Sequence, residues 1–159
     1  MAEEWGVIAV KAPVDIRKSV TKRANDVTEK ISILANHLGF ECGLVDQFAR
    51  QFDSISNTAG FIVIEYNGSE WVDFSKAAIE TKSNVKYYAR HGDEYGTSYY
   101  FSKDKEGKTL SICLDEEGDD EAFVGDNIKR DLGRWVNAIP KRLTKAFPDL
   151  NNLDPNQYD

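Results

Sequence analysis

The sequence predicts an α+β fold, an antiparallel β-meander sheet packed against a long N-terminal helix and a C-terminal helix. Apolar residues at steps of three, four or seven predict the helices, and β-rich runs separated by turn residues predict the meander. The chain has 159 residues, the usual size of one domain, and contains no internal repeat or low-complexity linker. We therefore expect a single domain over residues 1–159, with a frayed polar tail over 151–159.

The N-terminal part predicts a short strand followed by the long helix. The strand is expected over Trp5 to Lys11, which is β-rich and closed by Ala12-Pro13. Asp15 is expected to cap the helix and Gly39 to end it. The apolar stripe of this helix consists of Ile16, Val20, Val27, Ile31, Leu34 and Leu38.

The middle of the chain predicts a second helix and a hairpin. A helical stripe is expected over Leu44 to Ile55, with a strand starting at Phe40 as the alternative, and a strand is expected over Phe61 to Tyr66. Asn67-Gly68 is typical of a tight type I′ turn, which predicts a return strand over Ser69 to Phe74. Ser75 is then expected to cap a short helix that runs to Lys82.

The meander is expected in the second half, followed by the C-terminal helix. Its strands are predicted over Val85 to Arg90, Thr97 to Lys103 and Thr109 to Asp115, with turns at residues 91–93 and 104–107. Asp126 is expected to cap a helix whose apolar face carries Ile128, Leu132, Trp135 and Ile139. Pro140 should break or restart that helix near its end.

The charge of the chain is acidic and unevenly distributed. The sequence has 27 acidic against 20 basic residues, a net charge of −7, which repels nucleic acid and anionic lipid and favours basic partners. Residues 115–126 contain seven acids and no base, whereas residues 127–145 contain six bases and one acid. The final helix could neutralise the acidic segment within the chain, or the segment could be a docking surface for a basic protein.

The ends of the chain and its cysteines indicate a cytoplasmic protein. The N-terminus has no basic region of a secretory leader, and the longest apolar runs are far shorter than a membrane span. Cys42 and Cys113 are expected as thiols in a reducing compartment, with a bridge between them as the alternative. We expect no membrane and no nucleic-acid partner.

Two patterns suggest catalysis, and neither is complete. Arg90-His91-Gly92 after a β-run is similar to the phosphohistidine motif of histidine phosphatases, but those enzymes need a second histidine far downstream. The other histidine here, His37, is upstream, and the predicted helix end at Gly39 separates it from Cys42. We therefore expect no enzymatic activity; a small hydrolase using His91 or Cys42 stays as an alternative.

The acidic segment also raises the question of a metal. Asp115, Glu117 and Asp119 alternate and could offer oxygen ligands to calcium. Their spacing lacks the glycine at position six and the bidentate glutamate at position twelve of an EF-hand loop. We expect a solvated charge run, without a bound metal or any other cofactor.

The expected binding site for a protein partner consists of acids and one tyrosine. Acidic side chains steer basic partners, and tyrosine anchors interfaces. The candidate residues are Asp115, Glu116, Glu117, Asp119, Asp120, Glu121, Asp93, Glu94 and Tyr95. A structural or regulatory module that oligomerises through a sheet edge or a tyrosine-rich face is the alternative.

Three successive segments carry a resemblance to a known class of proteins. They are FIVIEYNGSEWVDF, SKAAIETKS and NVKYYARHGDEYGTSYYFSKDKEG. In their order they resemble small bacterial immunity proteins encoded beside polymorphic or contact-dependent toxins, over roughly residues 60–125. The resemblance implies an α+β fold and inhibition of a cognate basic toxin domain by occlusion. It carries over no individual site residue.

Overall fold

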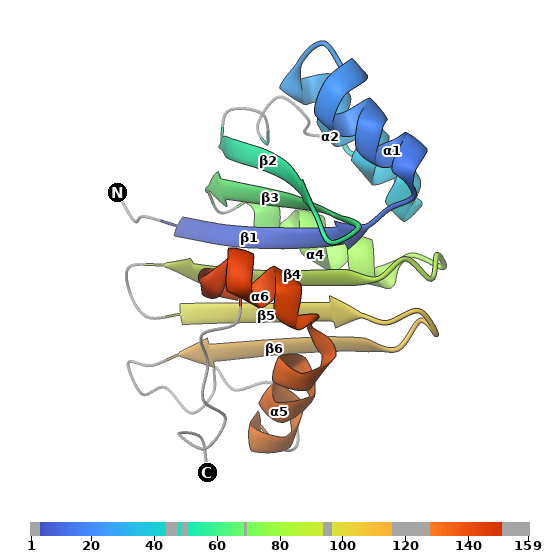
Figure 1. The fold of residues 1–159 in the computed structure, drawn as a ribbon. Coiled ribbons are helices and arrows are strands. Elements are labelled where there is room, and N and C mark those ends of the chain that lie inside the picture. The colour runs from blue at the N-terminus through green and yellow to red at the C-terminus, as the bar shows by residue number, and fades with distance from the viewer. Residues whose placement is uncertain are drawn as a thin grey trace.

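A computed structural model of the chain describes residues 4–43, 48, 51–68, 70–93, 97–115 and 128–150 (Figure 1). The elements in chain order are β1 Glu4–Lys11, α1 Val14–Lys18, the π-helical turn η1 Ser19–Arg23, α2 Val27–Leu38, β2 Phe52–Thr58, β3 Phe61–Asn67, α4 Glu70–Glu80, β4 Tyr87–Asp93, β5 Thr97–Lys103, β6 Thr109–Asp115, α5 Ile128–Ala138, α6 Lys141–Ala146 and the 3-10 turn η3 Pro148–Leu150. The α+β class is confirmed.

The strands form one antiparallel sheet in the order β2-β3-β1-β4-β5-β6. The meander β4-β5-β6 is as predicted, and β5 and β6 have the predicted bounds. Strand β4 is longer than expected because it does not turn at His91. That residue and Gly92 continue the ladder and pair with Gly6 and Trp5 on β1.

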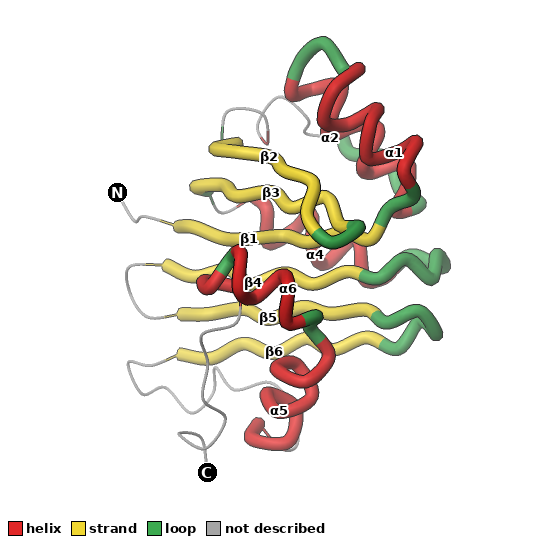
Figure 2. Tube along the Cα trace, viewed as in Figure 1, coloured by secondary structure: helices red, strands yellow, loops and turns green. Residues whose placement is uncertain are grey.

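Helices cover both faces of the sheet, and each face has its own apolar core (Figure 2). On one face, α2 and α4 bury Leu34 and Trp71 against the Ile8 side of β1. On the other, α5 and α6 bury Trp135 and Leu143 against the face of the sheet that carries Val7. Successive strand residues point to opposite faces, so alternate residues of the same strand contribute to different cores.

The prediction of a single long N-terminal helix is wrong. The strand predicted before it is present as β1, but the helical stretch behind that strand is divided into α1, η1 and α2. Ala24 is extended, and Asp26 begins α2 as an N-cap, because its Oδ1 accepts a hydrogen bond from the Glu29 N–H at 2.8 Å. Glu29 Oε2 accepts in return from the N–H of Asn25, the residue before the N-cap, at 2.9 Å, an arrangement that resembles a capping box. Asp15 lies inside α1, whose N-cap is Pro13, and is not a cap.

The hairpin was predicted in the wrong place. Residues 52–55, expected in a helix, belong to β2, which pairs with β3. The turn between these strands is Ala59-Gly60, with φ angles of 54° and 85°, as a type I′ turn requires. Residues 70–74 start α4 instead of a return strand, because Trp71, Phe74 and Ala78 bury one helical face. Ser75 is therefore inside α4 and is not its cap.

The C-terminal helical segment agrees with its prediction. Leu132, Trp135 and Ile139 are buried, and Pro140 interrupts the segment and is the N-cap of α6. The predicted cap Asp126 lies outside the described residues. Over the part of the chain that the structure describes, no helix is long and apolar enough to cross a membrane. Cys42 and Cys113 form no disulfide bond.

Candidate functional site

A polar cluster lies inside the core between α4 and the sheet. Ser75 on α4 places its Oγ 2.9 Å from His91 Nε2 and 2.7 Å from the hydroxyl of Tyr87, both on β4. The hydroxyl of Tyr66 on β3 lies 3.3 Å from the same histidine nitrogen. All four side chains are buried. His91 was predicted in a turn, and the structure places it in strand β4 with its side chain in the core.

Burial controls the protonation of this cluster. It lowers the pKa of His91 from 6.5 to about 3, because the charged ring would lose its hydration. It also raises the pKa of Tyr87, against the smaller opposing effect of the Ser75 hydrogen bond. The ring of His91 is thus neutral at physiological pH.

The Ser75–His91 distance suits proton transfer, but the environment does not favour catalysis. A nucleophile and base must both reach a substrate. Ser75 is 0% and His91 2% exposed, and aromatic rings of Tyr66 and Phe101 contact the imidazole. We interpret the cluster as a hydrogen-bonded core network that fixes α4 on the sheet.

The candidate binding surface lies at the end of the sheet where β1 begins and β4 and β6 end. We call it the acidic sheet end and define it by Glu4, Asp93 and Asp115 (left in Figure 1). Glu4 is directly opposite Asp93 in the β1–β4 register, and Asp115 is opposite Thr97 in the β5–β6 register. Like charges directly opposite one another destabilise a sheet.

Glu4 and Asp93 differ in how they are held. The Asp93 carboxylate accepts the Thr97 backbone N–H at 3.0 Å and so holds the start of β5. The Glu4 carboxylate forms no hydrogen bond or ion pair with any residue that the structure describes. Two acidic residues therefore face each other across neighbouring strands at this end of the sheet.

Tyr99 lies beside the acidic pair. Burial is the largest cause that raises the pKa of its phenol, and the opposing Cys113 side chain is the next. The carboxylates of Asp93 and Glu4 raise it further, which places both negative charges near the ring. Tyr99 stays partly exposed, so an aromatic side chain adjoins two carboxylates.

The structure describes two of the nine predicted partner-binding residues. Asp93 and Asp115 lie at the same end of the sheet, on the strands that flank β5. The predicted residues outside the described part are Glu94, Tyr95, Glu116, Glu117, Asp119, Asp120 and Glu121. Glu4 was missed because its position opposite Asp93 depends on strand order, which local sequence patterns do not encode.

The residues that the structure describes do not account for the net charge of −7. The described residues hold 19 of the 20 bases but 16 of the 27 acids. The acidic excess therefore lies in the remaining segments, two of which adjoin Asp93 and Asp115 in sequence. The acidic residues are therefore distributed unevenly along the chain.

The described residues include no group of three or more His, Cys, Asp or Glu side chains placed to hold a metal ion. No protein-family model, curated protein or solved structure matches the chain.

Proposed function

We propose that the chain is a protein-binding inhibitor of the immunity-protein kind, which covers a basic toxin domain and acts in the cytoplasm. The observation that carries the proposal is the Glu4–Asp93 pair, in which two like charges face each other at one end of the sheet. A cation from a partner would relieve their repulsion on binding.

The surroundings of the pair support a protein partner. Tyr99 beside the carboxylates supplies the partly exposed aromatic group that protein interfaces favour. The acid-rich residues 116–121 follow Asp115 directly, and Glu94 follows Asp93. Together they would extend one acidic surface that attracts a basic protein and accelerates its association.

Titration calorimetry against the protein encoded by the neighbouring gene tests the proposal. Glu4→Gln with Asp93→Asn should weaken binding about tenfold or more, mainly through slower association at low salt. Neutralising Glu116, Glu117, Asp119 and Asp120 together should weaken it as well. The matched control is Glu80→Gln with Glu106→Gln, which removes two exposed acids near the opposite end of the sheet and should leave the affinity unchanged.

An equal loss in the control pair would show that net charge, and not the acidic sheet end, determines binding. Absence of any complex with that neighbouring protein would contradict the proposal. Light scattering on the free protein separates this case from the alternative, a homo-oligomer formed through the edge strands β2 and β6.

A further inference from the structure

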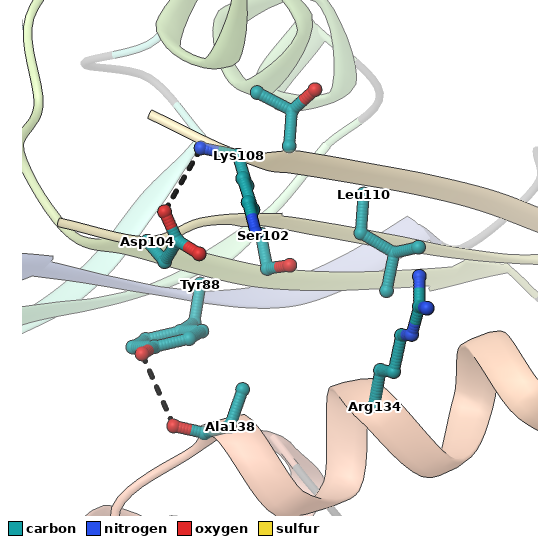
Figure 3. A pocket seen from close by; sticks show the side chains of 8 residues that line it. Tyr88, Ser102, Asp104, Lys108, Leu110, Arg134 and Ala138 are labelled. Carbon is teal, nitrogen blue, oxygen red and sulfur yellow. Dashed lines mark hydrogen bonds between the residues drawn. The ribbon is translucent and has the colours of Figure 1, made fainter. Parts of the chain in front are cut away.

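A second surface, which is independent of the proposed function, lies at the end of the sheet opposite the acidic sheet end. It is on the face of the sheet that α5 and α6 cover. A pocket of about 370 Å³ opens between α5 and the strands β4, β5 and β6 (Figure 3). Among the residues lining it are Tyr88, Ser102, Asp104, Lys108, Leu110 and Arg134. Its volume is within the range of small-ligand sites, roughly 300–1,000 Å³.

Two cations face this pocket from different elements. Arg134 extends from α5 toward Leu110, and Lys108 comes from the sheet side, just before β6 (Figure 3). Neither side chain makes a hydrogen bond or ion pair with any residue that the structure describes. Both charges are thus available to a ligand.

The acid in the pocket is already engaged. Asp104 Oδ1 accepts the backbone N–H groups of Glu106 and Lys108, each at 2.9 Å, and so holds the β5–β6 turn. Its charge is therefore directed to backbone donors, although it still counts against an anion nearby. Two cations against one such carboxylate leave the pocket net positive.

The remaining polar groups suit an anion with an organic body. The Tyr88 hydroxyl donates to the Ala138 carbonyl at 3.1 Å, which leaves the ring as a wall of the pocket. The Ser102 hydroxyl has no partner among the described residues and can donate to a ligand. Leu110 and Ala138 add apolar surface.

The helices beside the pocket increase its attraction for anions. Their exposed side chains include the bases Arg130, Arg134, Lys141, Arg142 and Lys145. The acid within α5, Asp131, is buried and lies 3.5 Å from the Nε of Arg130. A surface of one sign raises the local concentration of oppositely charged ligands.

We propose that this pocket binds a small organic anion, with its carboxylate or phosphate group held by Arg134 and Lys108. The Ser102 hydroxyl donates a further hydrogen bond, and the apolar part of the ligand lies against Leu110 and the Tyr88 ring. The planar fork of Arg134 matches either oxyanion, because both present two acceptor oxygens to it.

Titration of the ¹⁵N-labelled chain with phenyl phosphate, benzoate and the neutral benzyl alcohol tests this site. Amide shifts are expected around Ser102, Leu110 and Arg134 for the two anions and not for the alcohol. Arg134→Gln and Lys108→Gln should each weaken binding about tenfold. The control is Lys145→Gln, an exposed charge outside the pocket that adds only to the general positive field, and it should weaken binding much less than either pocket variant.

Binding of phenyl phosphate alone would assign the pocket to phosphate esters, and binding of both anions to organic anions in general. Three results would overturn the proposal: no binding of either anion, equal binding of the alcohol, or equal loss in the Lys145→Gln control. Circular dichroism of each variant confirms that a lost affinity is not a lost fold.

Discussion

The hydroxyl of Ser75 on α4 lies 2.9 Å from Nε2 of His91 on β4, and both side chains are buried. A pair that would suggest catalysis at a surface is here a link between a helix and the centre of a sheet. The Tyr87 hydroxyl, 2.7 Å from the same serine oxygen, makes that link a network. Its role can be measured through stability.

Removing the shared serine should cost more stability than removing one of its partners. Ser75→Ala leaves two buried polar groups without this partner and should cost about 1–3 kcal/mol in urea unfolding. Tyr87→Phe leaves the Ser75–His91 contact and should cost about 1 kcal/mol. The double variant should lose less stability than the sum of the two single losses, because both changes remove the same Ser75–Tyr87 hydrogen bond. Ser111→Ala on the exposed side of β6 is the control; additive losses would contradict a network.

Acid should destabilise the fold through His91. Its folded pKa of about 3 is below the ordinary 6.5, so the unfolded chain binds the proton first as pH falls. Stability from this residue is complete above pH 6.5 and declines below it, by about 1.4 kcal/mol per pH unit until pH approaches 3. His91→Phe should show a shallower loss between pH 6.5 and 4.5, measured by urea unfolding. Parallel curves for the two proteins would contradict this assignment.

The close packing of β1 depends on a missing side chain at Gly6. A Cβ there would lie 1.9 Å from the Tyr66 hydroxyl and 2.8 Å from the Arg90 carbonyl oxygen. Gly6→Ala should therefore cost about 1–3 kcal/mol through overpacking. Gly133→Ala in α5 meets no atom within 4 Å and should stabilise the helix by about 0.5–1 kcal/mol. Melting temperatures that move in the same direction for both variants would refute this contrast.

The start of α2 provides a test of the helix break. Asp26→Ala removes the side-chain acceptor for the Glu29 N–H and should lower the free energy of unfolding by about 1 kcal/mol. Asp15→Ala should have little effect, because Asp15 is within α1 and caps nothing. A larger loss at Asp15 would favour one continuous helix.

Local sequence patterns correctly predicted those elements that depend on interactions between residues close in sequence. Alternation defines β6, and the 3.6-residue period with Pro140 defines the C-terminal helical segment. The same reasoning did not predict the helix break at Asp26, because the apolar spacing continues across it. It also predicted a hairpin at Asn67-Gly68, where this turn-forming pair is followed by helix α4 instead of a return strand. The true hairpin turn uses Ala59, a residue that rarely adopts positive φ.

For the acidic sheet end, the sequence predicted the type of residue but not the geometry. Acid-rich sequence indicated a basic partner, and Asp93 and Asp115 lie at one sheet end. The Glu4–Asp93 pair and the Lys108–Arg134 pocket depend on which strands and helices become neighbours. That information is in long-range contacts, which a pass along the sequence does not contain.

The central place of β1 has a consequence for biosynthesis. Strand β1, which leaves the ribosome before the other described strands, is hydrogen-bonded on one side by β3 and on the other by β4. Neither neighbour has been translated when β1 emerges, and the ladder is incomplete until residue 93 has followed. During synthesis β1 therefore has two open edges until β3 has followed and one open edge until β4 has followed, and an unpaired apolar strand of this kind is prone to aggregation.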